Sequence, residues 1–396
     1  MNRLPEIFCM FVKKYTSEIV ISQQALQFNI DFLRKEMGKE VLISSVVKGN
    51  AYGHGIETFV PMAEDCGIKH FSVFSIQEAI RVKKVLKNNI PIMIMGYTSD
   101  SQLEWVIENN VEFFVSDLEK LKISIEVSKR LEKKALIHIE LETGMNRTGI
   151  AEATLSELVF PMLDSNREYY ILKGICTHFA GAESISNHIR VQQQKNLFLK
   201  LKTMFEQKGY NPEYIHASCS AAALRMKKMR FNMVRIGILQ FGFWPSQEVK
   251  MEYLIRKKLK HFNLKRLITW KSHIMAIKNV KMGDFIGYGN AYQASENMTI
   301  GVVPVGYSDG YSRMLSNSGT VLIGGIRAGI LGSINMNSLI IDLRYVENPN
   351  LGDTVTLIGS DGESEISVAS FSELSNQLNY ELLARLPLDI DRIPSN

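Results

Sequence analysis

Short apolar runs alternate regularly with longer segments of helical period from about residue 15 to residue 245. This alternation predicts βαβ units, in which parallel strands are joined by helices. About eight such units in some 230 residues match the size of a (β/α)8 barrel, and a doubly wound open sheet is the alternative. The expected strands are Glu18–Ser22, Val41–Val47, His70–Val73, Ile90–Met95, Val111–Val115, Ala135–Leu141, Ile171–Cys176, Tyr214–Ala217 and Met233–Ile236.

The pattern changes after Phe243-Trp244-Pro245, where short strands and Gly, Asn and Asp turns begin. The sequence therefore predicts an α/β fold, with an N-terminal (β/α)8 TIM-type barrel over residues 1–245 and a C-terminal mostly-β domain over 246–396. Residues before about 14 are candidates for pairing with the β domain, and helix is expected again only around Ser367–Leu378. The expected strands of this domain are Ile268–Ile277, Met298–Val305, Gly319–Ile323, Ile326–Leu331, Ser338–Asp342 and Thr354–Ile358.

Composition excludes several classes of protein. A net charge of +5 over 396 residues, without a dense basic stripe, argues against nucleic acid as a partner. No apolar run reaches the roughly 18–20 residues that span a bilayer. An acid and a proline near the start oppose a signal peptide. The four cysteines stand far apart without zinc spacing, so we expect no metal site and a reducing, cytoplasmic location.

The strand that ends near residue 47 carries a single lysine, Lys48, and a Gly-rich turn follows. In a barrel, catalytic groups lie at the C-terminal ends of the strands. Apolar neighbours would partly desolvate this amine, which lowers its pKa and frees it for Schiff-base chemistry. Spacing alone leaves open the alternative of a strand-end lysine that reaches water.

Residues 46–55 read VVKGNAYGHG, which closely resembles the lysine motif of the alanine racemase family, enzymes that use pyridoxal 5′-phosphate (PLP). Gly49 stands where that family has alanine. The resemblance implies that Lys48 binds PLP covalently and that Tyr52 contacts its phosphate.

Three further motifs of the expected barrel extend the resemblance. The loop 143–149, TGMNRTG, implies that Arg147 holds the substrate carboxylate, a task suited to a guanidinium fork. Residues 177–180, THFA, imply that the imidazole of His178 lies by the cofactor ring. Residues 216–222, HASCSAA, imply that Ser220 donates to the phosphate and that His216 braces a neighbouring arginine; Cys219 replaces the usual asparagine.

Residues 234–238, VRIGI, resemble the motif whose arginine faces the pyridine nitrogen of PLP. Here that residue is Arg235, and the backbone of Gly237 and Ile238 would contact the phosphate. A guanidinium cannot give up its proton, so the ring nitrogen would stay neutral. The ring is then a weaker electron sink than one held protonated by a carboxylate.

The expected β domain carries family motifs as well. Three segments resemble motifs of the same family: GYGNAY at 287–292, GYSDGY at 306–311 and YELL at 380–383. They contain Tyr288, Tyr307 and Tyr380. The resemblance implies that Tyr288 is the second catalytic base and that Tyr307 contacts the substrate. It places Tyr380 on the phosphate and the backbone N–H of Met336 on the substrate carboxylate. In the family the catalytic tyrosine comes from the partner subunit, so we expect a homodimer with composite active sites.

Some family positions differ in this chain. Glu140 stands where the family tends to have a lysine that is often carbamylated. A glutamate preserves the negative charge beside Arg147 but is shorter, and it predicts activity that does not depend on dissolved CO₂. Ser333 and Asn337 replace the family's arginine and aspartate, and with Asn335 they leave the identity of the substrate open.

The sequence thus predicts a PLP-dependent amino-acid racemase, with L-alanine and D-alanine as the first candidates and cell-wall D-alanine as the product. Racemisation needs a base on each face of the substrate, and the resemblance gives the D-face to Lys48 and the L-face to Tyr288. A racemase of another amino acid, such as serine or a basic one, is the alternative. A decarboxylase of the same fold and a non-catalytic PLP-binding protein also stay open.

Overall fold

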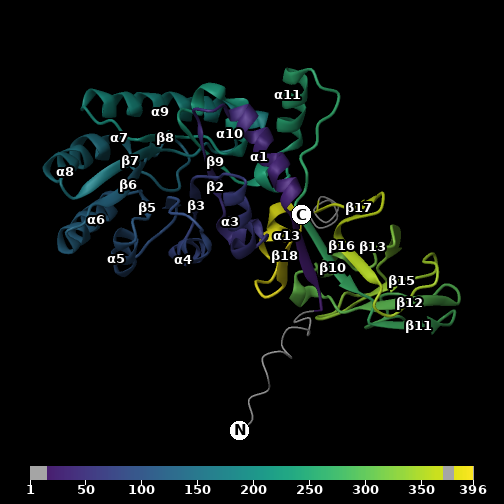
Figure 1. Cartoon of the computed structure of the whole chain (residues 1–396). Coiled ribbons are helices and arrows are strands. Elements are labelled where there is room, and N and C mark those ends of the chain that lie inside the picture. Colours follow the sequence, from purple (N-terminus) through teal and green to yellow (C-terminus); the bar gives the residue numbers. More distant parts are fainter. Residues whose placement is uncertain (1–15, 369–378, 396) are drawn as a thin grey trace, which may run out of the picture. The chain divides into compact units, whose positions relative to one another are not determined.

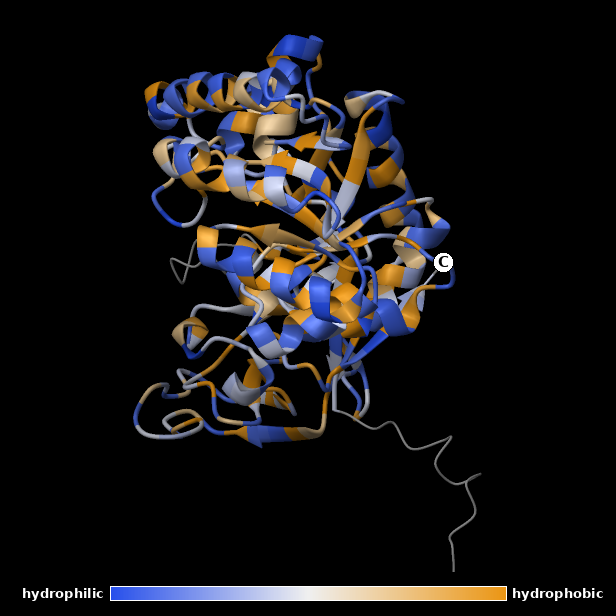
Figure 2. Cartoon of the chain, turned by 90° about the vertical axis from the view of Figure 1, so that its left-hand side faces the viewer, coloured by the Kyte–Doolittle hydropathy of each residue, from blue (hydrophilic) through white to orange (hydrophobic). Residues whose placement is uncertain are grey.

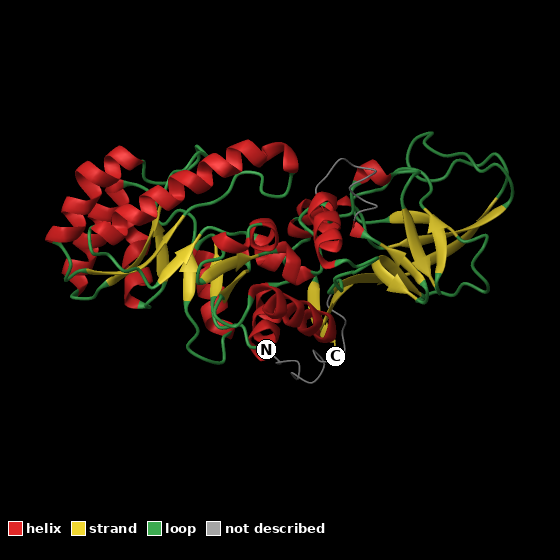
Figure 3. Ribbon diagram, turned by 90° about the horizontal axis from the view of Figure 1, so that it is seen from above, coloured by secondary structure: helices red, strands yellow, loops and turns green. Residues whose placement is uncertain are grey.

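The computed structural model describes residues 16–368 and 379–395. Contacts within the chain divide it into two compact units. The first, which we call the barrel unit, comprises Gln24–Ala51 and Phe59–Arg266; the second, the β unit, comprises Met1–Gln23, Tyr52–Thr58 and Leu267–Asn396. Helices dominate the barrel unit and strands the β unit (Figure 3). The boundary at residues 245/246 expected from the sequence stays a prediction.

The barrel unit is built on eight parallel strands in the order β8-β7-β6-β5-β4-β3-β2-β9. The strands are β2 (Leu42–Val46), β3 (Phe71–Val73), β4 (Ile92–Ile94), β5 (Glu112–Val115), β6 (Ala135–Glu140), β7 (Tyr170–Cys176), β8 (Tyr214–His216) and β9 (Met233–Ile236). Helices follow most of them and lie outside the strands (Figure 1). The main helices are α1 (Gln23–Met37), α3 (Ile56–Asp65), α4 (Ile76–Val85), α5 (Asp100–Glu108), α6 (Leu118–Leu131), α8 (Phe160–Ser165), α9 (His188–Gln207), α10 (Ser220–Arg225) and α11 (Gln247–Lys257).

The two ends of this sheet, β8 and β9, are joined through one side chain. The Nδ2 group of Asn232 donates to the carbonyl oxygen of Glu213 at 2.7 Å, and the N–H of Ile215 donates back to its Oδ1 at 2.8 Å. The N–H of Arg235 also donates to the carbonyl oxygen of Ser218 at 3.0 Å. The strands therefore come round into a barrel, and the predicted fold class is confirmed.

Hydropathy explains why this arrangement is stable. The strands are apolar, with β3, β4 and β5 buried at every residue, whereas the helices carry one apolar face toward them. Figure 2 shows the same division, with orange strands inside and blue segments along the outer helices. The few polar residues on the strands are therefore conspicuous, and three of them, Glu140, His216 and Arg235, belong to the candidate site.

The expectation that Glu18–Ser22 belongs to the barrel is wrong. This strand, β1, pairs antiparallel with β10 (Ile268–His273) and parallel with β18 (Asp391–Ser395), both in the β unit. Its alternating burial is that of a strand with two different faces, and such a pattern does not specify which sheet it joins. The proposed pairing of residues before about 14 lies outside the described residues.

The described residues of the β unit form two sheets. The first has the order β14-β13-β16-β10-β1-β18, with β17 paired to β16, and the second has the order β11-β12-β15. Their remaining strands are β11 (Ala276–Val280), β12 (Met298–Val303), β13 (Thr320–Ile323), β14 (Ile326–Gly329), β15 (Leu339–Asp342), β16 (Thr354–Asp361) and β17 (Ser364–Ile366). The helix α13 spans Asn379–Ala384. The helix expected around Ser367–Leu378 falls almost wholly outside the described residues.

One expected strand of the β unit is divided in the structure. The run Ile268–Ile277 forms β10 and the start of β11, which belong to different sheets. The N–H of Ile274 donates to Asp353, and that of Met275 donates to Val302. Because these consecutive residues bond to different sheets, the single apolar run contributes one strand to each sheet.

Gly53 is required by close backbone contact within the β unit. Its φ is +82°, and a Cβ atom there would lie 1.8 Å from the carbonyl oxygen of Leu383. Gly53→Ala must move backbone, so we expect it to lower the free energy of unfolding by about 3 kcal/mol. Gly352→Ala is the matched control, because Gly352 has φ +87° with nothing within 4 Å. Urea unfolding followed by circular dichroism checks this, and equal losses in the two variants would contradict it.

Candidate active site

Lys48 follows β2 directly and begins an uncommon stretch of backbone. Gly49, Asn50, Ala51 and Tyr52 all have left-handed conformations, with φ of 62°, 56°, 53° and 52°. Such conformations cost L-residues other than glycine roughly 1–2 kcal/mol each. Gly49, where the family has alanine, adopts the first of them without that cost.

Glu78, at the start of α4, holds this left-handed turn. Its Oε1 accepts hydrogen bonds from the N–H groups of Gly49 at 2.6 Å and Asn50 at 3.4 Å. Its Oε2 accepts from the N–H of Phe74 at 2.9 Å. Arg81, one turn further along α4, donates to the Asn50 side chain at 2.6 Å. Sequence reasoning missed Glu78, since an acidic residue in the first turn of a helix is common.

The surroundings of Lys48 favour the uncharged form of its amine. Burial of the amine and the positive charges of Arg147 and Arg235 lower its pKa, while the carboxylate of Glu78 acts in the opposite direction. The residue remains exposed along part of its surface in the single chain, so the amine can be reached. A lowered amine pKa is what a Schiff-base lysine needs at neutral pH.

Arg235, on β9, is buried, and its guanidinium is held from several sides. Its Nη1 donates to Nδ1 of His216 at 2.5 Å and to the carbonyl oxygen of the same residue at 3.0 Å. Its Nη2 donates to the carbonyl oxygen of Thr177 at 2.7 Å and lies 3.4 Å from Nδ1 of His178. The expected association of His216 with Arg235 is thus present in the structure, and His178 lies beside the same guanidinium.

His178 is held neutral by its surroundings. Burial, followed by the positive charges of Arg235, Arg147 and Lys48, lowers its pKa to about 3. Because a guanidinium can only donate, the Nδ1 atom that faces Arg235 acts as the acceptor. The ring proton of His178 therefore resides on Nε2.

Ser220 and the turn after β9 form a second polar group in the barrel unit. Ser220 begins α10, and its Oγ accepts from the N–H of Gly237 at 3.1 Å, which leaves its hydroxyl proton to donate elsewhere. Cys219, at the N-cap of α10, makes no side-chain capping bond, so the first turn is not capped by this residue. Ile238 follows Gly237 at the start of a short 3₁₀ turn. Groups of this kind bind phosphate oxygens.

Arg147 lies in the exposed loop after β6, and Glu140 is buried at the end of that strand. Among the described residues no hydrogen bond or ion pair joins the two. The Glu140 carboxyl instead lies near the side chain of Thr148, the neighbour of Arg147, which acts to lower its pKa. Burial raises the pKa of Glu140, and Thr148 together with the charges of Arg235 and Arg147 acts against the increase. The relation between Glu140 and Arg147 in the described residues is therefore electrostatic.

The other residues expected from the motifs belong to the β unit. Tyr288 is 75% exposed, at the tip of a turn between Gly287 and Gly289, whose φ values are 78° and 67°. Tyr307 and Met336 come from two loops joined by hydrogen bonds from Tyr307 to Asn335 and from Ser308 to Met336. Tyr307 and Met336 are also exposed.

Tyr52 and Tyr380, the two tyrosines expected on the phosphate, also fall in the β unit. Tyr52 is half-buried and closes the left-handed turn. Tyr380 lies in the first turn of α13, and its side chain is outside the described part of the chain. Their contact with the phosphate stays a prediction.

Comparison with known proteins agrees with this geometry. The model of the alanine racemase N-terminal domain matches residues 21–245, and that of the alanine racemase C-terminal domain matches residues 267–394. This chain belongs to the alanine racemase family. An alanine racemase of Leptospira interrogans is 33% identical, over 96% of both chains. The predicted family is therefore confirmed.

Two solved structures of alanine racemases are also similar. The enzyme from Bacillus anthracis with bound L-Ala-P has a TM-score of 0.87 at 30% identity, covering 97% of this chain and 96% of that one. The enzyme from Bartonella henselae with covalently bound pyridoxal phosphate has a TM-score of 0.80 at 25% identity, covering 96% and 100%.

The residues of the barrel unit fit the cofactor of this family. Both Nη atoms of Arg235 already donate to protein acceptors, and among the contacts of the described residues Nε has none, so it is the donor left for a ring nitrogen. Ser220 and the N–H groups near Gly237 and Ile238 supply donors for a phosphate. Lys48 supplies an amine with a lowered pKa. In the described ranges, no group of His, Cys, Asp or Glu side chains is arranged to hold a metal ion, and no helix is long and apolar enough to cross a membrane.

Glu140→Gln tests the acid that stands where the family tends to have a carbamylated lysine. Loss of one negative charge near Arg147 is expected to raise the KM for alanine about fivefold, which corresponds to about 1 kcal/mol. The parent enzyme is expected to show the same activity with added bicarbonate and after CO₂ depletion. Steady-state kinetics checks both expectations. If KM and kcat of Glu140→Gln are within twofold of the parent, Glu140 does not support substrate binding by Arg147.

The same substitution, Glu140→Gln, is not expected to destabilise the folded protein at pH 8. A carboxyl whose pKa is raised by folding stabilises the protein at low pH, and that contribution is lost as the pH rises through the raised value. Removing the ionisable group therefore should not lower Tm at pH 8. A KM increase without a Tm decrease separates an effect on the substrate from simple damage to the fold.

Proposed function

We propose that this chain interconverts L-alanine and D-alanine with pyridoxal 5′-phosphate as cofactor. The observation that carries the proposal is the position of a lysine amine of lowered pKa, Lys48, in the same unit as the buried guanidinium of Arg235. The first suits covalent binding of an aldehyde, and the second suits a neutral pyridine nitrogen. Family membership over nearly the whole chain supports the same function.

Arg235 and Arg147 have different roles in the proposed reaction. When bound, PLP withdraws electrons from the amino acid and makes its Cα proton acidic. Arg235 keeps all of its protons, so it orients the ring nitrogen without protonating it. By leaving the ring nitrogen neutral, Arg235 would make the ring a weaker electron sink and so favour return of the proton to Cα. Arg147 binds the substrate carboxylate through its two parallel N–H donors.

Two groups move the proton. Lys48 holds or releases it at Nζ on the D-face, and Tyr288 does so at Oη on the L-face. A single base would return the proton to the face from which it was taken, so both are needed. His178, neutral and protonated on Nε2, can donate a hydrogen bond toward a phenolate oxygen and stabilise it.

We place Tyr288 in the active site of a partner subunit, in a homodimer with two composite sites. Its 75% exposure in the single chain supports this arrangement, because a proton-transfer group works best where water is excluded. Exposure of Tyr307 and Met336 has the same explanation, and we assign both to the substrate side. The enzyme would act in the cytoplasm and supply D-alanine for the cell wall.

The substrate is tested directly with purified protein. We expect an absorbance band of lysine-bound PLP and formation of the D-enantiomer from L-alanine at a higher kcat/KM than from serine, lysine or arginine. Chiral chromatography of each reaction provides the measurement. A preference for another amino acid would point to the loop around Met336, where Ser333 and Asn337 differ from the family pattern. Absence of racemisation of every amino acid would overturn the proposed function.

A further inference from the structure

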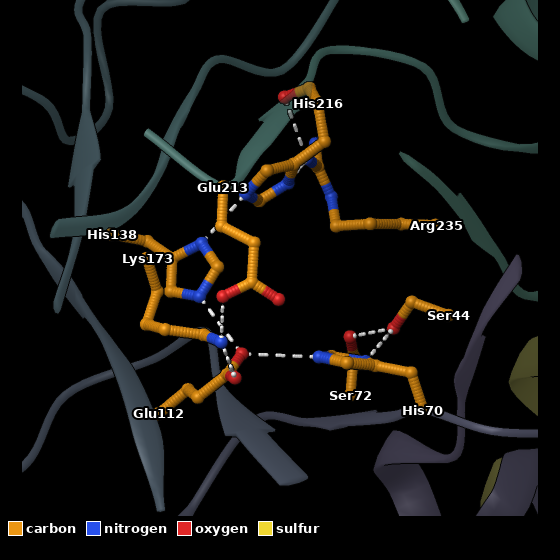
Figure 4. A network of polar contacts seen from close by, with 9 residues as sticks. All are labelled: Ser44, His70, Ser72, Glu112, His138, Lys173, Glu213, His216 and Arg235. Atoms are coloured by element: carbon orange, nitrogen blue, oxygen red, sulfur yellow. Dashed lines mark hydrogen bonds and ion pairs between the residues drawn. The ribbon is translucent and has the colours of Figure 1, made fainter. Parts of the chain in front are cut away.

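A row of buried polar side chains runs through the interior of the barrel unit, and only its first members belong to the motifs of the sequence (Figure 4). It begins at Arg235 on β9 and ends at Glu112 on β5, with His216 and His138 between them. Both imidazoles are fully buried, and Glu112 is 1% exposed. Barrel interiors are normally filled by branched apolar side chains, so this row is costly unless every member is paired.

Arg235 determines which atom donates and which accepts in each hydrogen bond of this row. Because a guanidinium has no acceptor, Nδ1 of His216, 2.5 Å away, must accept and carries no proton. The proton of the neutral His216 ring is then on Nε2, which donates to Nδ1 of His138 at 2.9 Å. The proton of His138 is in turn on Nε2, which donates to Oε2 of Glu112 at 2.9 Å. Every bond therefore points from the cation toward the carboxylate.

The charges of the row are consistent with this order. Burial lowers the pKa of both His138 and His216, so each ring is neutral. Burial acts to raise the pKa of Glu112, but hydrogen bonds from His138 and His70 outweigh it and hold the pKa below its ordinary value. A fixed cation and a fixed anion thus stand at opposite ends of two neutral imidazoles.

Glu112 is held in place by two further contacts. Nε2 of His70 lies 3.1 Å from the same Oε2 atom, and Nδ1 of His70 lies 2.8 Å from Oγ of Ser44 on β2. Lys173 on β7 lies 3.5 Å from Oε1 and forms a second ion pair with Glu213. The end of the row is therefore fixed by residues of three other strands or their ends.

We propose that Glu112 is a positioning residue, which through His138 and His216 fixes the direction of hydrogen bonding that holds Arg235 toward the cofactor's ring nitrogen. If the acceptor at Glu112 is lost, His138 can turn its proton to Nδ1 and force His216 to present an N–H to Arg235. Two donors would then face each other, and the guanidinium would be displaced. The role named for Arg235 rests on the proposed function; the direction of the hydrogen bonds does not.

The first test needs no variant. Protein loaded with PLP and labelled with ¹⁵N-histidine has only eight histidines, and long-range ¹H–¹⁵N correlation spectra report which ring nitrogen is protonated. Single His→Gln variants assign the signals. We expect His138 and His216 to be protonated on Nε2 alone, and a proton on Nδ1 of either ring would overturn the proposal. This result is independent of whether the protein racemises alanine.

The second test compares two substitutions of Glu112. Glu112→Leu removes the acceptor, and we expect kcat to fall about tenfold or more, the loss of a charge-assisted partner, with KM for alanine changed less than threefold. In the same variant the His216 spectrum should show a mixture of tautomers. Glu112→Gln keeps an acceptor oxygen for His138, so we expect it to restore kcat to within about threefold of the parent. Glu213→Gln is the matched control, since Glu213 shares Lys173 but contacts neither His138 nor His216.

These outcomes separate a positioning role from a purely structural one. Loss of stability alone would lower Tm in the Leu and Gln variants alike and leave kcat per PLP-loaded site unchanged. A kcat within twofold of the parent in Glu112→Leu, measured per bound PLP, would overturn the proposal. If that variant does not fold, the tautomers of the parent protein still decide. If the parent itself does not racemise alanine, the proposed function fails while the hydrogen-bond direction remains measurable.

Discussion

Lys48→Ala is expected to abolish racemisation in both directions and to remove the covalent bond to PLP. The change deletes the nitrogen that we assign to cofactor binding and one of the two groups that we assign to proton transfer, so no residual route is expected on the D-face. A loss of at least about a thousandfold in kcat/KM fits the removal of a group with both roles. Reduction with borohydride followed by mass spectrometry detects the adduct, and chiral chromatography measures the rate from each enantiomer.

A lysine with a lowered pKa at another position provides the control. Burial lowers the pKa of Lys120 to about 8, and its amine donates to Thr98 within the same unit. Lys120 is on α6 rather than at a strand end, so Lys120→Ala is expected to keep the adduct and racemisation while losing stability. A Lys48→Ala protein that still yields a borohydride-trapped adduct would show that Lys48 is not the PLP lysine. The two variants together show whether covalent binding of PLP depends on the position of the lysine or only on a lowered pKa.

The parts of the barrel that could be predicted are those with a local signal. Apolar runs bounded by polar turns located β2 to β9 to within a few residues, and helices lie between most of these strands, as the alternation predicts. Lys48 and Arg235 were identified because each stands in a contiguous motif. Glu18–Ser22 was assigned to the wrong sheet, because a strand's own pattern gives its faces and not its partners.

The polar row behind Arg235 could not be predicted in the same way. Glu112 and His138 lie on two strands and His70 directly precedes a third, and they are separated by more than 25 residues along the chain. No spacing rule connects them, and a lone polar residue in an apolar strand is compatible with many environments. The one available signal was the presence of such a residue in each of three strands that were otherwise expected to be buried.

The left-handed turn after Lys48 shows a different limit. Gly49 and Asn50 tolerate positive φ, so a turn at these positions could be expected. Ala51 and Tyr52 do not favour that conformation, and tertiary contacts impose it. Glu78, which bonds to the first two N–H groups of the turn, is 29 and 28 residues away from them in sequence. Local propensity therefore predicts the beginning of the turn and opposes its continuation.

Mixing two inactive variants is expected to restore activity if the active site is shared between subunits. Lys48→Ala and Tyr288→Phe each leave no complete site in a homodimer. A heterodimer of the two has one site with both substitutions and one with neither. Random exchange of equal amounts makes half of the dimers mixed, so roughly a quarter of the parent activity should return.

The recovery must come from subunit exchange and not from either parent preparation. Native mass spectrometry of differently tagged chains measures the heterodimer fraction, and activity should rise in proportion to it. Lys48→Ala mixed with the double variant Lys48→Ala/Tyr288→Phe is the control, because no combination of these chains contains a complete site. Full exchange without recovery would place Tyr288 in the site of its own chain or outside the reaction. In that case its 75% exposure would need another explanation, since a base open to water on most of its surface is poorly placed to return a proton to one face of Cα.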